Sequence, residues 1–188
     1  MRTFYFIGGA SGSGKTTIIL NLRALLGSDI SIYDFDDIGV PEDADKKWRQ
    51  EATEEWLQTL LTGGKNACVL GQIVLGEILA CPSAQHIEKV NFCLLDVDDF
   101  ERIQRLKRRN TYGADQTMLN WSAWLRMHHQ DPQWAQHVLK EDCWKGLDFS
   151  AWDKLTSWES KANVKILNTT DLSITESAHA VANWIKSL

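Results

Sequence analysis

Residues 3–17 read Thr-Phe-Tyr-Phe-Ile-Gly-Gly-Ala-Ser-Gly-Ser-Gly-Lys-Thr-Thr, and the rest of the chain is best interpreted from this stretch. An apolar, aromatic run typical of a strand ends at Gly8, a glycine-rich loop follows, and residues 16–26 have the pattern of a helix. Residues 9–16 match G-x-x-x-x-G-K-[ST] in full, the pattern of the phosphate-binding P-loop. The stretch therefore predicts a nucleoside triphosphate site between a strand and a helix, and not an ordinary glycine-rich turn.

The residue types in this loop suit a polyphosphate. Glycines let the backbone wrap closely around an anion, and the N-terminus of the following helix adds unpaired N–H groups and the positive end of its dipole. Lys15 supplies a mobile charge for the β- and γ-phosphates, and the hydroxyl of Thr16 is placed to ligate Mg²⁺. The predicted nucleotide contacts are Gly9, Ala10, Ser11, Gly12, Ser13, Gly14, Lys15, Thr16 and Thr17.

Composition narrows the class of protein. The chain has 188 residues, 44% of them hydrophobic, which is enough for one domain with a substantial core. A formal net charge of -5 argues against nucleic acid as a bulk partner. The first residues form a strand, not a cleavable leader, and no apolar run approaches the length that spans a membrane. We expect a cytoplasmic protein that binds neither nucleic acid nor membrane, with its oligomeric state open.

The alternation of strand and helix patterns predicts an α/β fold. Such alternation builds a parallel sheet covered by helices on both faces, with the ligand at the carboxyl ends of the strands. The expectation is a single domain over residues 1–188, a three-layer α/β/α sandwich with a five-stranded parallel sheet and a helical lid. The expected strands are 3–8, 29–34, 66–71, 89–96 and 163–167; the expected helices are 16–26, 43–62, 98–110 and 173–186, with two or three tryptophan-bearing helices within 111–160.

Three carboxylates follow the second predicted strand, at Asp34, Asp36 and Asp37. The carboxyl end of this strand lies on the same edge of the sheet as the P-loop. One carboxylate there can help to hold Mg²⁺ through water, and another can accept a proton from an attacking hydroxyl. The alternative is that these side chains only cap the turn that follows the strand.

Arginines gather on the helix after the fourth strand. Arg102, Arg105 and Arg109 are spaced three and four residues apart and therefore share one face of the helix. Planar guanidinium groups suit phosphoryl oxygens, where charge develops during transfer. The alternative is a solvated basic face that balances nearby acidic residues.

With these motifs the chain resembles the small P-loop kinases, the group that includes shikimate, gluconate, adenylylsulfate and nucleoside monophosphate kinases. The resemblance spans almost the whole chain in its order of elements. It includes the Asp-x-Asp pair Asp34 and Asp36, the Arg-Leu-x-x-Arg pattern over residues 105–109, and a Thr-rich loop at 168–171. In that family the aspartates contact metal-bound waters and the acceptor, the arginines clamp the transferring phosphates, and the loop borders the adenine. The resemblance thus implies ATP and Mg²⁺ as cofactors and Thr170 as an adenine neighbour.

The sequence also departs from that family. Shikimate kinases carry a run of glycines after the third strand, where this chain has only Gly71 before Gln72. The resemblance implies a substrate contact at the position of Gln72, whose amide can both donate and accept, and this side chain can equally cap a turn. Asp96 ends the fourth strand as a metal-binding aspartate would, but with an Asp-x-Asp pair already present we expect it to matter little.

The acceptor side is predicted from the helical segment at about 42–62, which lies over the acceptor pocket in this family. Trp48 can stack on an acceptor or belong to the apolar face of the helix, and Arg49 can contact an anionic acceptor. Residues of about 110–135 are the candidate lid, which closes to exclude water.

We therefore expect an ATP-dependent kinase acting on a nucleoside, nucleotide or other small-molecule hydroxyl. Asp36 or Asp34 is expected to deprotonate the acceptor. The alternative is a nucleotide switch or regulator acting through a protein partner, although no base-reading Asn-Lys-x-Asp motif occurs. The expected catalytic residues are Lys15, Asp34, Asp36, Arg105 and Arg109, the metal ligands Thr16 and Asp34, and the substrate contacts Asp36, Asp37, Arg49 and Gln72.

Overall fold

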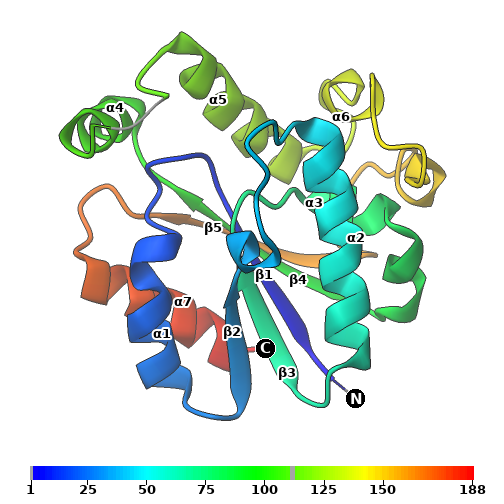
Figure 1. The fold of residues 1–188 in the computed structure, drawn as a ribbon, viewed down its shortest axis with the longest axis horizontal. Coiled ribbons are helices and arrows are strands. Elements are labelled where there is room, and N and C mark those ends of the chain that lie inside the picture. The colour runs from blue at the N-terminus through cyan, green and yellow to red at the C-terminus, as the bar shows by residue number, and fades with distance from the viewer. Residues whose placement is uncertain (1, 111–112) are drawn as a thin grey trace.

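The computed structural model describes residues 2–110 and 113–188. Its centre is a five-stranded sheet with strand order β2-β3-β1-β4-β5, in which every neighbouring pair is parallel (Figure 1). The central strand β1 pairs Phe6 with Val69 on one side and with Phe92 on the other. The strands are β1 (Phe4–Gly8), β2 (Ile30–Asp34), β3 (Asn66–Leu70), β4 (Val90–Asp96) and β5 (Ala162–Asn168).

Helices cover both faces of this sheet, so the predicted three-layer architecture is confirmed (Figure 1). Side chains alternate between the faces of a strand; in β1, Phe4 and Phe6 join one core cluster, while Tyr5 and Ile7 join the other. The helices are α1 (Ile19–Leu26), α2 (Lys46–Thr62), α3 (Leu75–Ala80), α4 (Asp99–Arg108), α5 (Gln116–Gln130), α6 (His137–Lys140) and α7 (Ile174–Lys186), with 3-10 helices η1 (Thr16–Ile18), η2 (Phe35–Ile38), η3 (Pro82–His86) and η4 (Phe149–Ala151).

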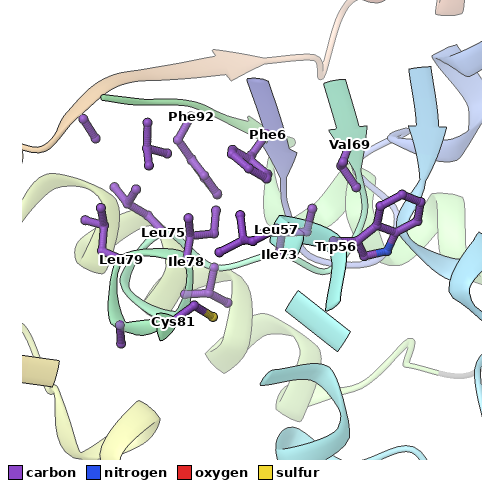
Figure 2. Close-up of a cluster of buried hydrophobic side chains, with 14 of the residues drawn as sticks. Phe6, Trp56, Leu57, Val69, Ile73, Leu75, Ile78, Leu79, Cys81 and Phe92 are labelled. Carbon is purple, nitrogen blue, oxygen red and sulfur yellow. The ribbon is translucent and has the colours of Figure 1, made fainter. Parts of the chain in front are cut away.

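The two clusters are covered by different helices. The cluster with Tyr5 is closed by α1 and α7, and the cluster with Phe6 is closed by α2, α3 and α5. Figure 2 shows the second cluster, in which Trp56 and Leu57 of α2 and Ile78 of α3 lie against Phe6 and its neighbours in the sheet. Truncating a buried side chain such as Phe6 to Ala costs about 3–5 kcal/mol, so this packing fixes the strand ends that carry the site.

Helix α2 begins later than the sequence predicted. The side chain of Asp45 accepts a hydrogen bond of 2.8 Å from the backbone N–H of Trp48 and caps the helix there. The residues before it therefore form a loop. At the other end of the chain, α7 begins as expected, with a capping box between Ser173 and Glu176.

The expectation of several tryptophan-bearing helices within 111–160 is wrong. In the described part of this segment, α5 is the one helix that contains tryptophan, at Trp121 and Trp124. Trp152 and Trp158 lie outside helices but are buried, and each indole N–H donates to a backbone carbonyl, at 2.7 and 2.9 Å. Tertiary contacts thus place these side chains where helical periodicity does not. Among the described helices, none combines the length and the apolar character needed to cross a bilayer.

Candidate functional site

The P-loop runs from β1 to η1 and packs its backbone against the ends of β4 and α4. Gly9 and Gly12 have φ angles of +151° and +83°, which L-residues with side chains rarely adopt. A Cβ on Gly9 would lie 2.4 Å from the carbonyl oxygen of Leu95, and one on Gly12 would lie 3.3 Å from Cγ of Arg102. Glycine is therefore favoured at both positions by conformation, and at Gly9 also by space, because the close atom there belongs to the backbone.

Lys15 lies inside the curve of this loop. Its Nζ donates hydrogen bonds to the carbonyl oxygens of Gly9, at 2.6 Å, and Ala10, at 3.0 Å, and to Oγ of Ser13, at 3.3 Å. Burial, with a further contribution from the nearby charge of Arg102, lowers the pKa of Lys15 to about 7. A phosphate bound in the loop would therefore stabilise the charged form of Lys15.

Two buried side chains donate hydrogen bonds to backbone carbonyl oxygens of the P-loop. Arg102 donates to the carbonyl oxygen of Ser11 at 2.9 Å and to the carboxylate of Asp96 at 2.8 Å. The hydroxyl of Thr169, after β5, donates to the carbonyl oxygen of Ser13 at 3.3 Å. Arg102 is therefore an internal support and not part of an exposed basic face.

These supports were not identified from the sequence. Asp96 was expected to matter little, yet it accepts hydrogen bonds from Arg102 and from Arg126 of α5. The signal that was present is a carboxylate at the end of β4 followed by an arginine on the first turn of the next helix, Arg102. Asp96 thus helps to hold Arg102 against the P-loop, and its carboxylate oxygens are already occupied by Arg102 and Arg126.

The three carboxylates after β2 divide into two roles. Asp34 accepts a hydrogen bond of 3.2 Å from the N–H of Asp36, and Asp37 accepts one of 3.2 Å from the N–H of Asp34, so these two form a capping box on η2. The carboxylate of Asp36 accepts no hydrogen bond from the described residues. Partial burial and the neighbouring Asp34 raise its pKa. Of the three carboxylates, Asp36 is thus the one without a hydrogen-bond donor among the described residues.

A cavity, here called the phosphate cavity, joins the P-loop to these carboxylates. A second hollow, the outer cavity, lies between η2, the start of α2 and the residue after Gly71. Asp36 and Gln72 line both, so the two cavities meet at these side chains. The phosphate cavity contains the predicted residues Lys15, Thr16, Thr17, Asp34, Asp36, Gln72 and Arg109; the outer cavity contains Asp36, Arg49 and Gln72.

Gln72 lies at this junction with an exposed side chain. Within the described residues its amide makes no hydrogen bond to a turn, so it remains available to a ligand. Trp48 lines the outer cavity and also packs edge-on against Phe35, with ring centroids 6.0 Å apart. The packing against Phe35 and the place in the cavity wall are thus both observed, and stacking of Trp48 on an acceptor stays a prediction.

The arginines of α4 have different surroundings. Arg109 is exposed and lines both the phosphate cavity and a third cavity between the P-loop and the start of α7. Arg105 lines this third cavity and not the phosphate cavity, and it donates to the carbonyl oxygens of Thr169, at 2.9 Å, and Thr170, at 3.1 Å. The hydroxyl of Thr170 accepts from the N–H of Asp98 at 2.8 Å and does not line the cavity.

Arg49, predicted as an anion contact, is paired inside the protein. Its Nε and one terminal nitrogen donate to the carboxylate of Glu77, at 3.0 and 2.7 Å. Its guanidinium also lies over the ring of Trp121, 5.2 Å from the centroid. Glu77 is fully buried and accepts a further hydrogen bond of 2.9 Å from Gln50.

The predicted lid at 110–135 includes the whole of α5. Thr111 and Tyr112 lie outside the described residues. In α5, Trp124, Leu125 and His128 are buried in the core. Arg126 bridges Asp96 and Asp99, with shortest distances of 3.3 and 3.2 Å. The C-terminal half of α5 is thus attached to the end of β4 and to the start of α4, and the closing motion of this segment stays a prediction.

The oxygen atoms at the phosphate cavity suit Mg²⁺. Thr16 and Asp34 line the same cavity as Lys15, and hydroxyl and carboxylate oxygens are hard ligands of the kind that Mg²⁺ takes together with water and phosphate. Within residues 2–110 and 113–188 there is no group of three or more His, Cys, Asp or Glu that could hold a metal by themselves. The donor set fits a cation that arrives with a nucleotide.

Comparison with known proteins identifies relatives of this fold. A family model described as AAA domain matches residues 6–120. No curated protein sequence gives a significant match. Three solved structures have similar folds over nearly the whole of both chains. They are a sugar kinase from Janibacter sp. HTCC2649 (13% identity, 99% and 95% covered, TM-score 0.58), a shikimate kinase from Acinetobacter baumannii in complex with shikimate (16%, 100% and 94%, 0.56) and a tunicamycin resistance protein from Deinococcus radiodurans (11%, 98% and 96%, 0.59).

Proposed function

This chain belongs to the AAA domain family, and we propose that it is an ATP-dependent phosphotransferase that moves the γ-phosphoryl group to a hydroxyl of a small molecule. One observation carries the proposal. The carboxylate of Asp36, which accepts no hydrogen bond from the described residues, lies in the wall shared by the phosphate cavity and the outer cavity. A base at that point can accept the proton of a hydroxyl held in the outer cavity while the oxygen of that hydroxyl attacks the γ-phosphorus held in the phosphate cavity, with ADP as the leaving group.

The donor side would hold the triphosphate of ATP. Backbone N–H groups of the P-loop and the ammonium of Lys15 bind phosphate oxygens, and Arg109 approaches them from α4. Thr16 and Asp34 would hold Mg²⁺, which, when bound, neutralises charge on the phosphates. Because Lys15 and Arg109 are both cations in one cavity, they stabilise the negative charge that spreads over the transferring group.

The acceptor side would provide the base and the orientation. Asp36 accepts the proton of the attacking hydroxyl, because its carboxylate accepts no hydrogen bond from the described residues and lies at the junction of the two cavities. Gln72 can donate to and accept from the acceptor at the junction of the cavities. Asp34 is a weaker candidate for the base because it caps η2.

The structural neighbours support this assignment through their printed names, a sugar kinase and a shikimate kinase, whose substrates carry hydroxyl groups. We propose further that the partners of this chain are small molecules and not nucleic acid. The alternative of a nucleotide switch places the same demand on Lys15 but gives no task to a free carboxylate between two cavities.

The test is a transfer assay with ATP labelled at the γ-phosphorus, Mg²⁺ and the small-molecule extract of the source cells. We expect the label to appear in a new phosphorylated compound, and to disappear from it when Lys15→Ala replaces the wild-type protein. Release of inorganic phosphate alone, accelerated by an added protein fraction, would instead establish the nucleotide switch and reject the phosphotransferase.

A further inference from the structure

We propose that the outer cavity selects an acceptor with no anionic group, such as a free sugar, a polyol or a nucleoside, and rejects carboxylated and phosphorylated compounds. This inference rests on the proposed function and specifies its acceptor class. It is drawn from the charges that surround the outer cavity and from the partners that those charges already have.

The first step concerns Arg49, the residue of the outer cavity best suited to an anion. Its charge is balanced by Glu77, which receives two of its N–H groups and has no exposure to solvent. The pair is therefore neutral as a unit toward a ligand. An anionic acceptor would have to compete with a buried carboxylate that cannot move into water, and such an ion pair is costly to break.

The second step concerns Lys46, the other cation of the outer cavity. Its Nζ donates to the backbone carbonyl oxygens of Val138, at 3.3 Å, and of Glu141. Val138 lies in α6 and Glu141 directly follows its last residue, so the ammonium is bound to this neighbouring segment. Lys46 therefore serves to attach α6 to the start of α2, and its hydrogen bonds are directed away from a ligand.

The third step concerns the carboxylates that remain. Asp36, Glu42 and Asp45 line the outer cavity, and Glu42 and Asp45 are exposed. Because Glu77 balances the charge of Arg49, Lys46 is the one remaining cation among the described lining residues, against three carboxylates. The net charge of the lining is therefore negative. A carboxylate or phosphate on the acceptor would meet like charge, and like charges in a partly desolvated cleft repel.

What the outer cavity does offer is suited to neutral polar compounds. The ring of Trp48 gives a flat apolar surface on which a sugar face or a base can pack. The second terminal nitrogen of Arg49 has no partner among the described residues and can donate to a hydroxyl or a carbonyl. Gln72 adds a donor and an acceptor next to Asp36.

The test separates acceptors by charge before they are identified. The small-molecule extract is passed over an anion exchanger at pH 8, and the unretained and retained fractions are assayed for transfer of the γ-phosphoryl group. We expect at least about tenfold more transfer to the unretained fraction, since one repelled charge in a cleft costs on the order of a factor of ten or more in binding. Acceptor activity mainly in the retained, anionic fraction would overturn this inference and keep the phosphotransferase. Activity in neither fraction would reject both.

A charge variant tests the cause of the preference. Glu77→Gln removes the balancing charge and leaves a side chain that can still accept from Arg49. With adenosine and AMP, and with glucose and gluconate, as matched probes, inhibition of transfer by the anionic member of each pair should strengthen about tenfold. Glu51→Gln makes the same charge change at an exposed position of α2 outside the outer cavity and should leave inhibition within about twofold. Equal inhibition of both variants would refute the role given to the Arg49–Glu77 pair.

Discussion

The donor side and the acceptor side of this site are built in different ways. The P-loop is a backbone structure whose carbonyls are held by buried side chains, Arg102 and Thr169. The outer cavity is formed by η2, an exposed loop and side chains of α2 that are paired with other parts of the chain. A backbone site can be recognised in a short motif, whereas the character of a side-chain site depends on partners distant in sequence. The proposed phosphate site is therefore readable from the sequence, whereas the proposal for the acceptor rests on contacts that only the structure shows.

A large effect should follow from breaking the donor side at the ammonium of Lys15, which lies inside the P-loop. Lys15→Ala removes the ammonium from the loop and should lower kcat for transfer by about 10³, the upper range for loss of one preorganised donor. The measurement is single-turnover transfer at saturating ATP. A loss of less than about tenfold would mean that Lys15 does not stabilise the transferring group.

A smaller effect should follow from releasing the loop without touching the cavity. Arg102→Leu removes the hydrogen bond to the carbonyl of Ser11 and should weaken ATP binding by about tenfold, measured by calorimetry. Asp96 keeps Arg126 as a partner, so the variant leaves no unpaired buried carboxylate. The control is Arg126→Gln, which keeps the tether of the loop and should change ATP affinity by less than about threefold. Equal effects of the two variants would contradict the support role of Arg102.

The low pKa of Lys15 predicts how ATP affinity depends on pH. The pKa is about 7 in the free protein, and a bound phosphate raises it, because the opposite charge favours the ammonium. Binding therefore takes up a proton when the pH lies above about 7, and affinity should fall by up to about tenfold per pH unit from there to pH 9. Titration calorimetry in buffers of different ionisation enthalpy measures that proton. Lys15→Ala should remove the dependence, and a flat profile in the wild type would contradict the assignment.

The smallest effect concerns the capping role of Asp37. Asp37→Ala removes the hydrogen bond to the N–H of Asp34 and should lower the free energy of unfolding by about 1 kcal/mol, the usual worth of a cap. Urea denaturation measures it. Transfer activity should fall by less than about threefold, since loss of a surface cap moves the strand end only slightly. A much larger loss of activity at unchanged stability would restore Asp37 to the substrate contacts predicted from sequence.

Much of the fold and the nucleotide side could be predicted from sequence because their signals are local. The P-loop pattern, the apolar strands and the capping box at Ser173 lie within short windows. The hydrogen bond from Arg102 to Ser11 joins residues 91 positions apart, and the ion pair of Arg49 with Glu77 joins residues 28 positions apart. Contacts at such separations produce no periodic pattern in the sequence and could not be predicted from it. The structure places Lys15 and Asp36 in one cavity, as expected because the carboxyl ends of parallel strands lie at the same edge of the sheet.

The most direct test of the account replaces the carboxylate at the junction of the two cavities. Asp36→Asn keeps the shape of the side chain and removes its ability to accept a proton. Transfer at saturating ATP should fall by about 10²–10⁴, the contribution of a general base, while the Kd for ATP changes by less than about threefold. Asp37→Asn, the same change one residue along, should have a far smaller effect. Transfer at the wild-type rate by the Asp36→Asn protein would contradict the account.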